Sequence, residues 1–436
     1  MKNIFLKRGW AIVSKKGEKL HYAWWIAIAC CAIYAGSVGI IVSCAGLFYK
    51  SVSTELGVGT ADIVFYTTLM YLVITITLPF AGKIFSKFNI RLILSVAALT
   101  DALAFGLMGT YTSVYQFYVS GVLLGISNSF LIYAAVPLII NNWFKVKMGT
   151  VLGLSMTFMG IGGAIFAPIS GYLIETIGWR SSYMVLGVLV AVLTLPFTIF
   201  VIRKDPKEKN MTAYGSEIAE ESTKKVVDET GTPLKQAIRS VSFYAVFIFT
   251  GLLGLVVTVS FHIPNHLLSE GFSTTLAASV VTCVMIGQTS GKFLLGWLND
   301  KAGINITNFV GIGSGMTGIL LILFSGSIGV ISLYIGGLAF GIGYSCSTLL
   351  PPFMIKAVFG NRDYAAIYTI VMSSATLAIA VGTTIFGFVY DITGSYYAVF
   401  LGVLAIQVFA ILLGLITLRR KAIEANKNTV LAVNEN

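Results

Sequence analysis

The segment Gly296–Gly303 (GWLNDKAG) follows a long apolar run, and a related segment, Gly82–Asn89 (GKIFSKFN), holds the equivalent place 214 residues earlier. A second pair, Gly171–Gly178 (GYLIETIG) and Gly387–Gly394 (GFVYDITG), recurs at an offset of 216 residues. Two matched pairs at nearly the same offset predict that the chain is a duplication of one structural unit.

The composition places both copies of this unit in a membrane. The 436 residues are 56% hydrophobic and only 11% charged, whereas about a quarter of the residues of a soluble domain are charged. A membrane crossing needs roughly 20 apolar residues. Twelve stretches of about that length are present: 23–48, 61–82, 91–110, 115–139, 148–173, 181–202, 243–268, 273–298, 306–324, 329–353, 364–389 and 396–418. They leave no room for a large soluble catalytic domain.

We therefore expect an all-α membrane protein with twelve transmembrane helices, arranged as two parallel six-helix repeats. The segment between the repeats carries charges of both signs and few large apolar residues, which is typical of a solvated linker. The expected divisions are a cytoplasmic N-terminal segment (1–22), an N-terminal bundle (23–202), a cytoplasmic linker (203–240), a C-terminal bundle (241–418) and a cytoplasmic tail (419–436).

The basic residues predict the orientation. With the N-terminus in the cytoplasm, 26 of the 29 Lys and Arg residues lie on the cytoplasmic side, Lys50 and Arg180 lie outside, and Lys292 lies within a helix. This distribution follows the positive-inside rule, so the net charge of +11 reflects topology and no nucleic-acid partner is expected. We expect a monomeric, multi-pass protein of the plasma (inner) membrane with both termini in the cytoplasm.

The loop pattern G-x-L-x-D-[KR]-x-G after helices 2 and 8 resembles the signature of the major facilitator superfamily, along the whole chain. A narrower pattern is similar to the oxalate/formate antiporter and monocarboxylate transporter families. It consists of Tyr22-Ala-Trp24-Trp25, Trp143-Phe144, Lys147-x-Gly149, Gly162-Gly163, Pro168 and Gly178-Trp179-Arg180. The resemblance implies alternating access of a midplane site between the two halves.

The same resemblance implies a gating motif in the two signature loops. In the first copy Ser86 replaces the signature aspartate, so we expect the charged gating contact only in the second copy. The gating residues are Gly82, Lys87, Arg91, Gly296, Asp300 and Lys301.

Lys292 is the leading candidate for substrate binding, because an ionisable residue inside a membrane helix is costly and is a functional candidate by default. It precedes Asp300 by two turns, where the resembled families carry an arginine that pairs with the substrate carboxylate. The alternative is a lysine whose long side chain reaches the cytoplasmic surface. Gln288 lies one turn earlier on the same face and is expected to contact the same ligand.

The number of intramembrane cations favours a single carboxylate as substrate. The stretch 364–389 contains no Lys or Arg, so the second cation of the oxalate exchangers is absent. A dianion beside Lys292 alone would be left half-paired in a low dielectric.

The remaining pocket residues are polar or aromatic. Tyr34, Tyr71, Tyr133, Asn128 and Tyr344 are candidates for a cavity that accepts an apolar or aromatic acid body. For each of them, packing or a lipid-facing position is the alternative.

His262 and Asp101 are candidates for proton coupling. His262 shares a helical stripe with Thr258 and Asn265, next to Pro264, which predicts a bend at a wet cavity. For both titratable residues the alternative is a structural hydrogen bond. The positions aligned with the lysine and aspartate that the animal proton-coupled monocarboxylate transporters use are Ser43 and Gln288, so anion exchange, facilitated diffusion and proton symport all remain open.

The predicted function is therefore secondary active or facilitative transport of a small organic anion, a monocarboxylate, with protons or a counter-transported anion as possible partners. We expect no enzymatic activity, no cofactor and no metal. The alternative in the same fold is a proton-coupled drug or metabolite exporter, which the position of Pro168 after Gly162-Gly163 disfavours. A non-transporting membrane sensor ranks third.

Overall fold

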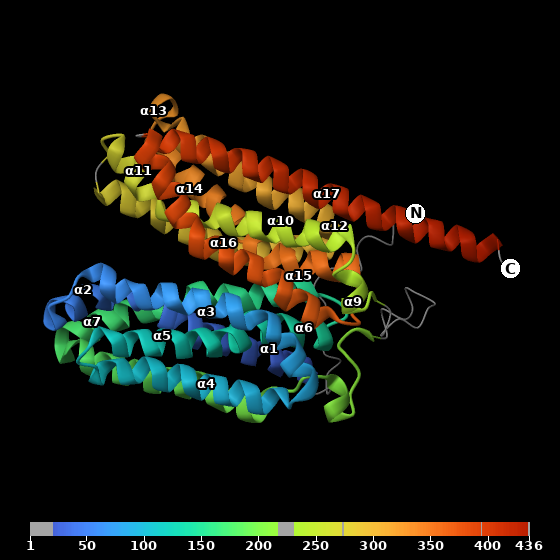
Figure 1. Ribbon diagram of the computed structural model, residues 1–436, viewed down its shortest axis with the longest axis horizontal. Coiled ribbons are helices and arrows are strands. Elements are labelled where there is room, and N and C mark those ends of the chain that lie inside the picture. The colour runs from blue at the N-terminus through green and yellow to red at the C-terminus, as the bar shows by residue number, and fades with distance from the viewer. Residues whose placement is uncertain (1–20, 217–230, 273, 394, 435–436) are drawn as a thin grey trace, which may run out of the picture.

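The structure is a computed structural model that describes residues 21–216, 231–272, 274–393 and 395–434. Figure 1 shows two helical bundles lying side by side, one formed by the N-terminal half and the other by the C-terminal half. The N-terminal half comprises α1 (Tyr22–Ile33), η1 (Tyr34–Val42), α2 (Ala45–Leu56), α3 (Thr60–Lys87), α4 (Ile90–Gly106), η2 (Leu107–Thr110), α5 (Val114–Asn128), η3 (Ser129–Ala135), α6 (Val136–Trp143), α7 (Met148–Pro196) and η4 (Phe197–Val201).

Two short helices lie between the bundles in the sequence, η5 (Pro206–Lys209) and α9 (Leu234–Ala237). The C-terminal half comprises α10 (Val241–Thr258), η6 (Val259–Phe261), α11 (Ile263–Ser269), α12 (Thr274–Leu323), α13 (Ser325–Ile328), α14 (Val330–Tyr344), α15 (Cys346–Phe359), α16 (Tyr364–Thr393) and α17 (Tyr396–Asn434).

The described residues contain ten helical runs that are long and apolar enough to cross a membrane, and two of these runs each contain two crossings. The run Met148–Val201 turns at Gly178 (φ 76°), and the run Ser279–Leu323 turns at Gly303 (φ 78°). Side chains other than glycine rarely adopt this backbone conformation. The two turns raise the number of crossings to twelve, so the predicted all-α fold with twelve transmembrane helices is confirmed.

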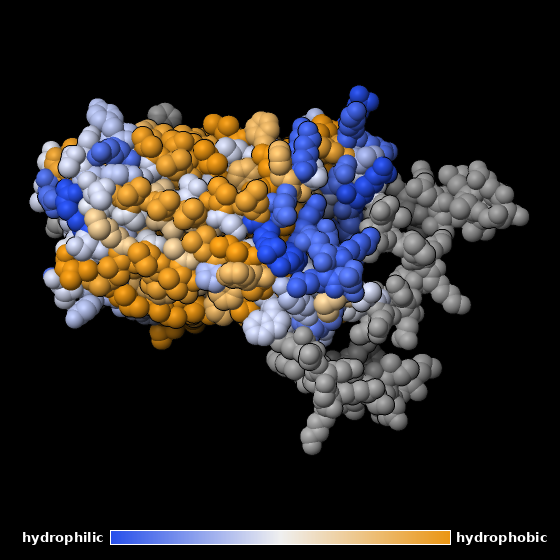
Figure 2. All heavy atoms as spheres, turned by 90° about the horizontal axis from the view of Figure 1, so that it is seen from below, coloured by the Kyte–Doolittle hydropathy of each residue, from blue (hydrophilic) through white to orange (hydrophobic). Residues whose placement is uncertain are grey.

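An apolar belt surrounds the middle of the molecule, and polar residues gather at its two ends. Figure 2 shows the belt in orange and a large blue region at one end. We call this the basic end. Among the described residues it carries Lys87, Lys145, Lys147, Lys301 and Lys356. A helix satisfies most of its backbone hydrogen bonds internally, which is what a lipid environment requires.

Small residues let helices of the N-terminal half approach closely. A Cβ atom added to Gly39 of η1 would lie 2.7 Å from Cα of Gly162 in α7. Contacts of this kind are a common means of packing helices in membranes. Both η1 and η3 are π-helical, a local widening of the helix that is frequent at functional sites.

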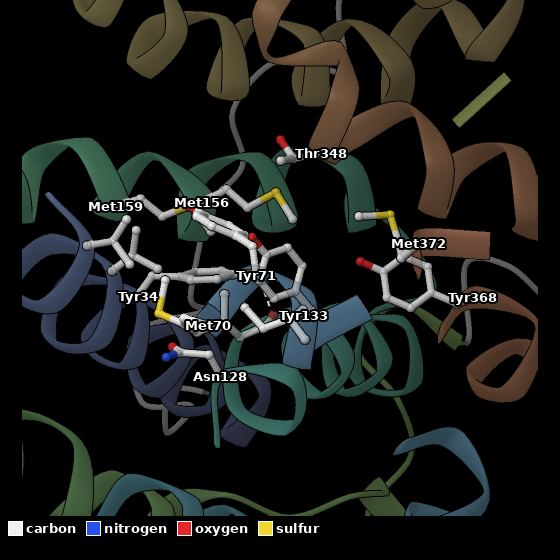
Figure 3. Close-up of a pocket in the computed structure, with 14 residues that line it drawn as sticks. Tyr34, Met70, Tyr71, Asn128, Tyr133, Met156, Met159, Thr348, Tyr368 and Met372 are labelled. Carbon is white, nitrogen blue, oxygen red and sulfur yellow. Dashed lines mark hydrogen bonds between the residues drawn. The ribbon is translucent and has the colours of Figure 1, made fainter. Parts of the chain in front are cut away.

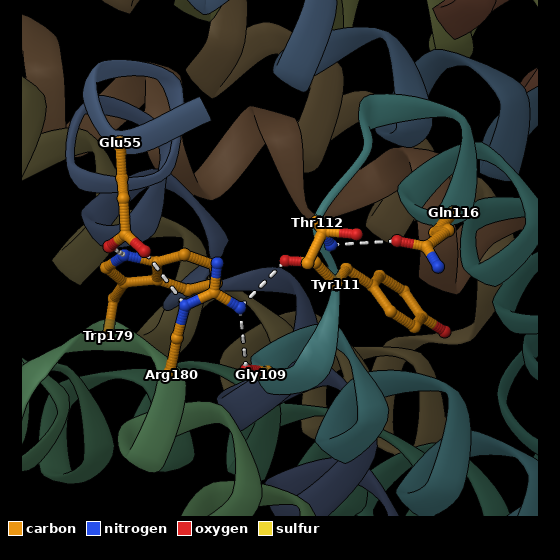
Figure 4. A network of polar contacts seen from close by, with 7 residues as sticks. All are labelled: Glu55, Gly109, Tyr111, Thr112, Gln116, Trp179 and Arg180. Atoms are coloured by element: carbon orange, nitrogen blue, oxygen red, sulfur yellow. Dashed lines mark hydrogen bonds and ion pairs between the residues drawn. The ribbon is translucent and has the colours of Figure 1, made fainter. Parts of the chain in front are cut away.

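At the end opposite the basic end, an ion pair ties three segments of the N-terminal half together (Figure 4). The Glu55 carboxylate of α2 accepts hydrogen bonds from the indole of Trp179 and from Nε of Arg180, the latter at 2.9 Å. Arg180 Nη1 also donates to the carbonyl oxygens of Gly109 and Tyr111, at 3.2 and 2.8 Å. The hydrogen bonds from Arg180 and Trp179 hold the pKa of Glu55 below its ordinary range.

The lowered pKa of Glu55 predicts a stability that depends on pH. A group whose pKa is depressed in the folded state stabilises the fold above its unfolded pKa, about 4.3 for glutamate, and loses that contribution as the pH falls through the folded pKa. We expect the melting temperature of the wild type to fall more steeply below about pH 4.3 than that of Glu55→Gln. Thermal melts between acidic and neutral pH measure this; parallel curves for the two proteins would contradict it.

Candidate substrate-binding site

A cavity of about 80 Å³ lies between the two halves, and side chains from both halves form its wall (Figure 3). The N-terminal half contributes residues of η1, α3, α5, η3 and α7, whereas α15 and α16 contribute the rest. The lining residues are Tyr34, Val38, Val42, Met70, Tyr71, Ile74, Asn128, Ile132, Tyr133, Met156, Met159, Thr348, Tyr368 and Met372.

Aromatic and thioether side chains form most of the cavity wall. Four tyrosines and four methionines dominate it, and Asn128 and Thr348 add polar groups. Methionine is flexible and polarisable, so it adapts to ligands of irregular shape. Of the residues predicted from the sequence, four lie together around this cavity: Tyr34, Tyr71, Asn128 and Tyr133.

Lys292 lies next to the cavity, separated from it by one side chain. It is only 4% exposed, on α12, and its Nζ donates to the Met159 sulfur at 3.5 Å. Met159 itself lines the cavity. A thioether is a weak acceptor, and within the described part of the chain Lys292 forms no ion pair. The fold thus buries an ammonium group without a matching anion, beside a cavity.

Gln288 and Tyr344 lie near each other but not on the cavity wall. The Gln288 side chain interacts with the hydroxyl of Tyr344, and Ser345 Oγ donates to the Gln288 carbonyl oxygen at 2.8 Å. These contacts hold α12 against the end of α14, one helical turn before Lys292.

Asp101 of α4 is completely buried in the N-terminal half and is connected to the cavity through one residue. Its Oδ1 accepts hydrogen bonds from Ser127 Oγ and, at 3.4 Å, from Asn128 Nδ2. Within the described residues its Oδ2 accepts no hydrogen bond that meets the distance and angle limits, and the Ser37 hydroxyl of η1 is the polar group that interacts with this carboxyl from the neighbouring helix. Because Asn128 lines the cavity, the Asp101 carboxyl lies one side chain away from it.

His262 lies away from this cavity. Its ring contacts Phe386 and Tyr396, with centroids 6.2 and 5.8 Å away, and His262 is not among the residues that line the cavity. His266, one turn farther, is buried among aromatic rings, the nearest being Phe400 at 4.9 Å. The helical stripe that suggested a wet cavity near His262 therefore faces aromatic side chains at this position.

Asp300, at the basic end, joins the two halves. Its Oδ1 accepts a hydrogen bond from the Gly149 backbone N–H at 2.8 Å, and its Oδ2 accepts one from Thr150 N–H at 2.6 Å. These donors belong to the first turn of α7, where free N–H groups and the helix dipole favour a carboxylate. The expected charged contact of the second signature loop is thus made with backbone amides.

Both signature glycines lie where the halves touch. A Cβ on Gly296 would lie 2.3 Å from the Gly149 oxygen, and one on Gly82 would lie 2.6 Å from Cα of Ala366 in α16. The duplicated motif therefore forms two related close contacts between the halves, α12 with α7 and α3 with α16.

The other three gating candidates do not bridge the halves. Lys87 is exposed, Arg91 Nε donates to the Ile199 carbonyl oxygen of η4 in its own half, and Lys301 Nζ lies 4.3 Å from the ring centre of Trp297 in its own loop.

Further hydrogen bonds between the halves occur level with the cavity or on its basic-end side. Thr75 Oγ1 donates to Thr376 Oγ1 at 2.9 Å, and Asn141 Nδ2 donates to Asn361 Oδ1 at 3.2 Å. Thr157 Oγ1 donates to the Thr289 carbonyl oxygen at 3.2 Å. Together with Asp300, these contacts join the two halves on the basic-end side of the molecule.

Sequence reasoning did not select several residues that the structure brings to the site. The methionines and Tyr368 were not distinguishable from packing residues. The helices that carry them are apolar along their length, so these positions do not stand out in the sequence. Gly149, whose backbone N–H is a partner of Asp300, was noted only as part of a family pattern.

Two bundles of membrane-crossing helices, closed at one end around a cavity between them, are the architecture of a secondary transporter. The family model described as Major Facilitator Superfamily matches residues 30–352 and 264–432. The chain belongs to this superfamily.

Comparison with individual proteins agrees with this assignment. The chain is 24% identical over 335 residues to an uncharacterized MFS-type transporter, YhjX, of Escherichia coli, covering 74% of this chain and 78% of the relative. It is 22% identical over 394 residues to monocarboxylate transporter 4 of Gallus gallus, covering 86% and 79%. Among solved structures, the proton:xylose symporter XylE superposes with a TM-score of 0.69 at 13% identity, covering 90% of this chain and 94% of XylE. FucP in its outward conformation gives a TM-score of 0.64 at 15% identity, covering 92% and 99%.

Proposed function

We propose that this transporter carries a small monocarboxylate by alternating access, with Lys292 as the group that binds the carboxylate. The observation that carries the proposal is the buried ammonium of Lys292, whose described partner is a weak thioether acceptor beside the cavity. A substrate carboxylate that displaces Met159 would supply the missing anion. The similarity to monocarboxylate transporter 4 supports the same substrate class.

The number of charges at the site sets the charge of the substrate. Lys292 is the only Lys or Arg that the described crossings bury deep in the molecule. One ammonium balances one carboxylate, whereas a dicarboxylate would leave a second charge unpaired in a low dielectric. The tyrosine and methionine wall suits an apolar or aromatic body attached to that carboxylate.

The experiment that tests this function is uptake into proteoliposomes. A labelled aliphatic monocarboxylate, its neutral amide and a dicarboxylate of similar length are compared with protein-free vesicles. The proposal requires saturable uptake of the monocarboxylate and little uptake of the other two. Equal uptake of the amide would overturn the role of charge, and uptake of none of the three would overturn the substrate class.

We place the basic end in the cytoplasm of a plasma membrane, with the protein acting as a monomer. The lysines of the basic end support this orientation through the positive-inside rule. In this orientation the contacts of Asp300 close the cytoplasmic side.

Export of a drug or an apolar metabolite is the second candidate. The observation that favours it is the methionine-rich wall, since such surfaces accept varied apolar ligands. Protection of expressing cells against cationic dyes would support export, and monocarboxylate uptake without such protection would exclude it.

Asp101 is the group that we propose for proton coupling. The groups described around it are the Ser37 and Ser127 hydroxyls and the Asn128 amide, with no charged partner. A substrate that contacts Asn128 would alter the hydrogen bonding of the Asp101 carboxyl, which links substrate binding to this titratable group.

We expect Asp101→Asn to keep exchange of labelled for unlabelled substrate while losing acceleration by a proton gradient. Asparagine has nearly the same shape and mimics the protonated carboxyl, so the fold is preserved. Uptake at several imposed pH gradients measures the effect, with His262→Gln as the comparison. A full gradient response in Asp101→Asn would assign this carboxyl a structural role.

A further inference from the structure

Three buried oxygen atoms at or beside the Asp101 carboxyl form no hydrogen bond with the described residues. They are Asp101 Oδ2, the Ser37 hydroxyl oxygen and Asn128 Oδ1, on side chains that are at most 1% exposed. The Ser37 hydroxyl interacts with the carboxyl from η1, and the Asn128 amide contacts it from the end of α5. Buried polar atoms are normally paired, so a group of unpaired oxygens indicates a place for a further ligand, such as an ion or a water molecule.

The hydrogen atoms that α5 offers to this cluster are shared among several acceptors. Asn128 Nδ2 donates to the Leu124 carbonyl oxygen at 2.7 Å and to Asp101 Oδ1 at 3.4 Å. The Ser127 hydroxyl carries one hydrogen, yet Asp101 Oδ1 and the carbonyl oxygens of Leu123 and Leu124 all lie within its reach. A hydrogen bond from the Ser37 hydroxyl to Asp101 Oδ2 would still leave Asn128 Oδ1 unpaired. The cluster therefore has more lone pairs than hydrogen atoms.

Two of the helices that carry these oxygens are widened at this place. Ser37 lies within the π-helical segment η1, and Asn128 immediately precedes the π-helical segment η3. Widened turns of this kind are frequent at functional sites. In membrane transporters, irregular helical segments supply the oxygen atoms that hold coupling ions. The local backbone thus suits a site for an ion better than a simple packing contact.

We propose that Asp101, Ser37 and Asn128 form a binding site for a monovalent metal cation, Na⁺. Hard cations prefer carboxylate, carbonyl and hydroxyl oxygens. One carboxylate balances one positive charge, and the contacts described for Asp101 include no other charged group, so a divalent ion would be left with excess charge in a low dielectric. A proton gives a hydrogen to one carboxyl oxygen only, whereas a cation can be coordinated by all three unpaired oxygens.

The neutral oxygens supply most of the ligands in this site. Among the residues that the structure describes, no group of three or more His, Cys, Asp or Glu side chains could hold a metal ion. A site with a single carboxylate binds its ion more weakly than a cluster of acidic residues does, because ligand charge tunes affinity. Such an ion can therefore bind and leave during each transport cycle.

The position of the site links the ion to the substrate. Asn128 lines the candidate substrate cavity (Figure 3), and Tyr34 and Val38, on either side of Ser37 in η1, line it as well. An ion that orders Ser37 and Asn128 shapes this wall of the cavity, so ion and substrate favour each other's binding to the same extent. This coupling rests on the proposed function, whereas the binding of the ion does not.

The test measures the response of the full-length purified protein to Na⁺ in detergent, at fixed pH and without substrate. NaCl replaces choline chloride at constant ionic strength, and the melting temperature is followed. We expect a saturable rise in the wild type and none in Asp101→Asn. In Ser37→Ala the half-maximal Na⁺ concentration should be about tenfold higher or more, since removing a group that supports a metal site commonly costs at least that factor in affinity.

Ser129→Ala is the matched control. Ser129 follows Asn128 and is equally buried, but its hydroxyl donates to the Ile126 carbonyl oxygen at 2.7 Å, so this variant should keep the wild-type response to Na⁺. Equal melting temperatures in NaCl and choline chloride would overturn the proposal, as would a full response in Asp101→Asn. Either result leaves the monocarboxylate proposal standing, because the assay contains no substrate. Failed uptake of every monocarboxylate beside an intact Na⁺ response would overturn the proposed function alone.

Discussion

Monocarboxylate uptake by Lys292→Gln is expected to fall about 30-fold or more below that of the wild type. Removing one partner of a buried charge pair costs about 2–5 kcal/mol, and about 1.4 kcal/mol corresponds to a factor of ten in affinity. The measurement is the initial rate of uptake into proteoliposomes at low substrate concentration. Uptake by Lys292→Gln above half the wild-type rate would contradict the role of the ammonium group.

The same variant is expected to be more thermally stable than the wild type. In the absence of substrate, the described contacts of Lys292 offer its charge only the Met159 thioether, and burying an uncompensated charge is unfavourable. A higher melting temperature together with lost uptake would show that the variant is folded and that its loss of uptake is a loss of function. Lys292→Arg, which keeps the charge, is expected to retain part of the uptake. The control with unchanged uptake is Lys83→Gln, because Lys83 is exposed and was assigned no role in the site or the gating motif.

The second large effect is expected for Gly296→Ala, which adds a single methyl group at the contact between the halves. That Cβ would lie 2.3 Å from the Gly149 oxygen and 3.2 Å from Cα of Gly153. The obstructing atoms belong to the backbone, so they cannot move aside as a side chain would. Overpacking of this kind costs about 1–3 kcal/mol, which corresponds to a shift of about 5- to 150-fold against the closed state.

Gly313→Ala is the matched control for this prediction. Gly313 lies on the second of the two crossings that α12 contains, beyond the turn at Gly303, and a Cβ there meets no atom within 4 Å. Alanine is the better helix former by about 1 kcal/mol, so neither substitution weakens the helix itself. Uptake should fall about tenfold in Gly296→Ala and stay unchanged in Gly313→Ala. Equal uptake by the two variants would show that close approach at Gly296 is not needed for transport.

The architecture was predictable from the sequence because the bilayer permits few solutions. Long apolar stretches must become helices to satisfy their backbone groups, and the repeat at Gly82 and Gly296 indicated duplication. The two chain reversals at Gly178 and Gly303 fall in the motifs that revealed the repeat. The family assignment follows from the same motifs.

The candidate site was predictable only in part. Tyr34, Tyr71 and Tyr133 were selected one helix at a time, and the structure gathers them with Asn128 around one cavity. Contacts across the halves could not be predicted, because they depend on how the helices cross. Asp300 is an example: its partners are backbone N–H groups, which every residue carries and no residue type signals.

Equilibrium binding of a labelled monocarboxylate to the purified protein is the most direct measurement of the central claim, since it does not require the halves to move. The account predicts saturable binding to the wild type that the unlabelled carboxylate displaces and its neutral amide does not. It also predicts no detectable binding to Lys292→Gln. Binding of equal affinity to both proteins would contradict the claim that Lys292 holds the carboxylate.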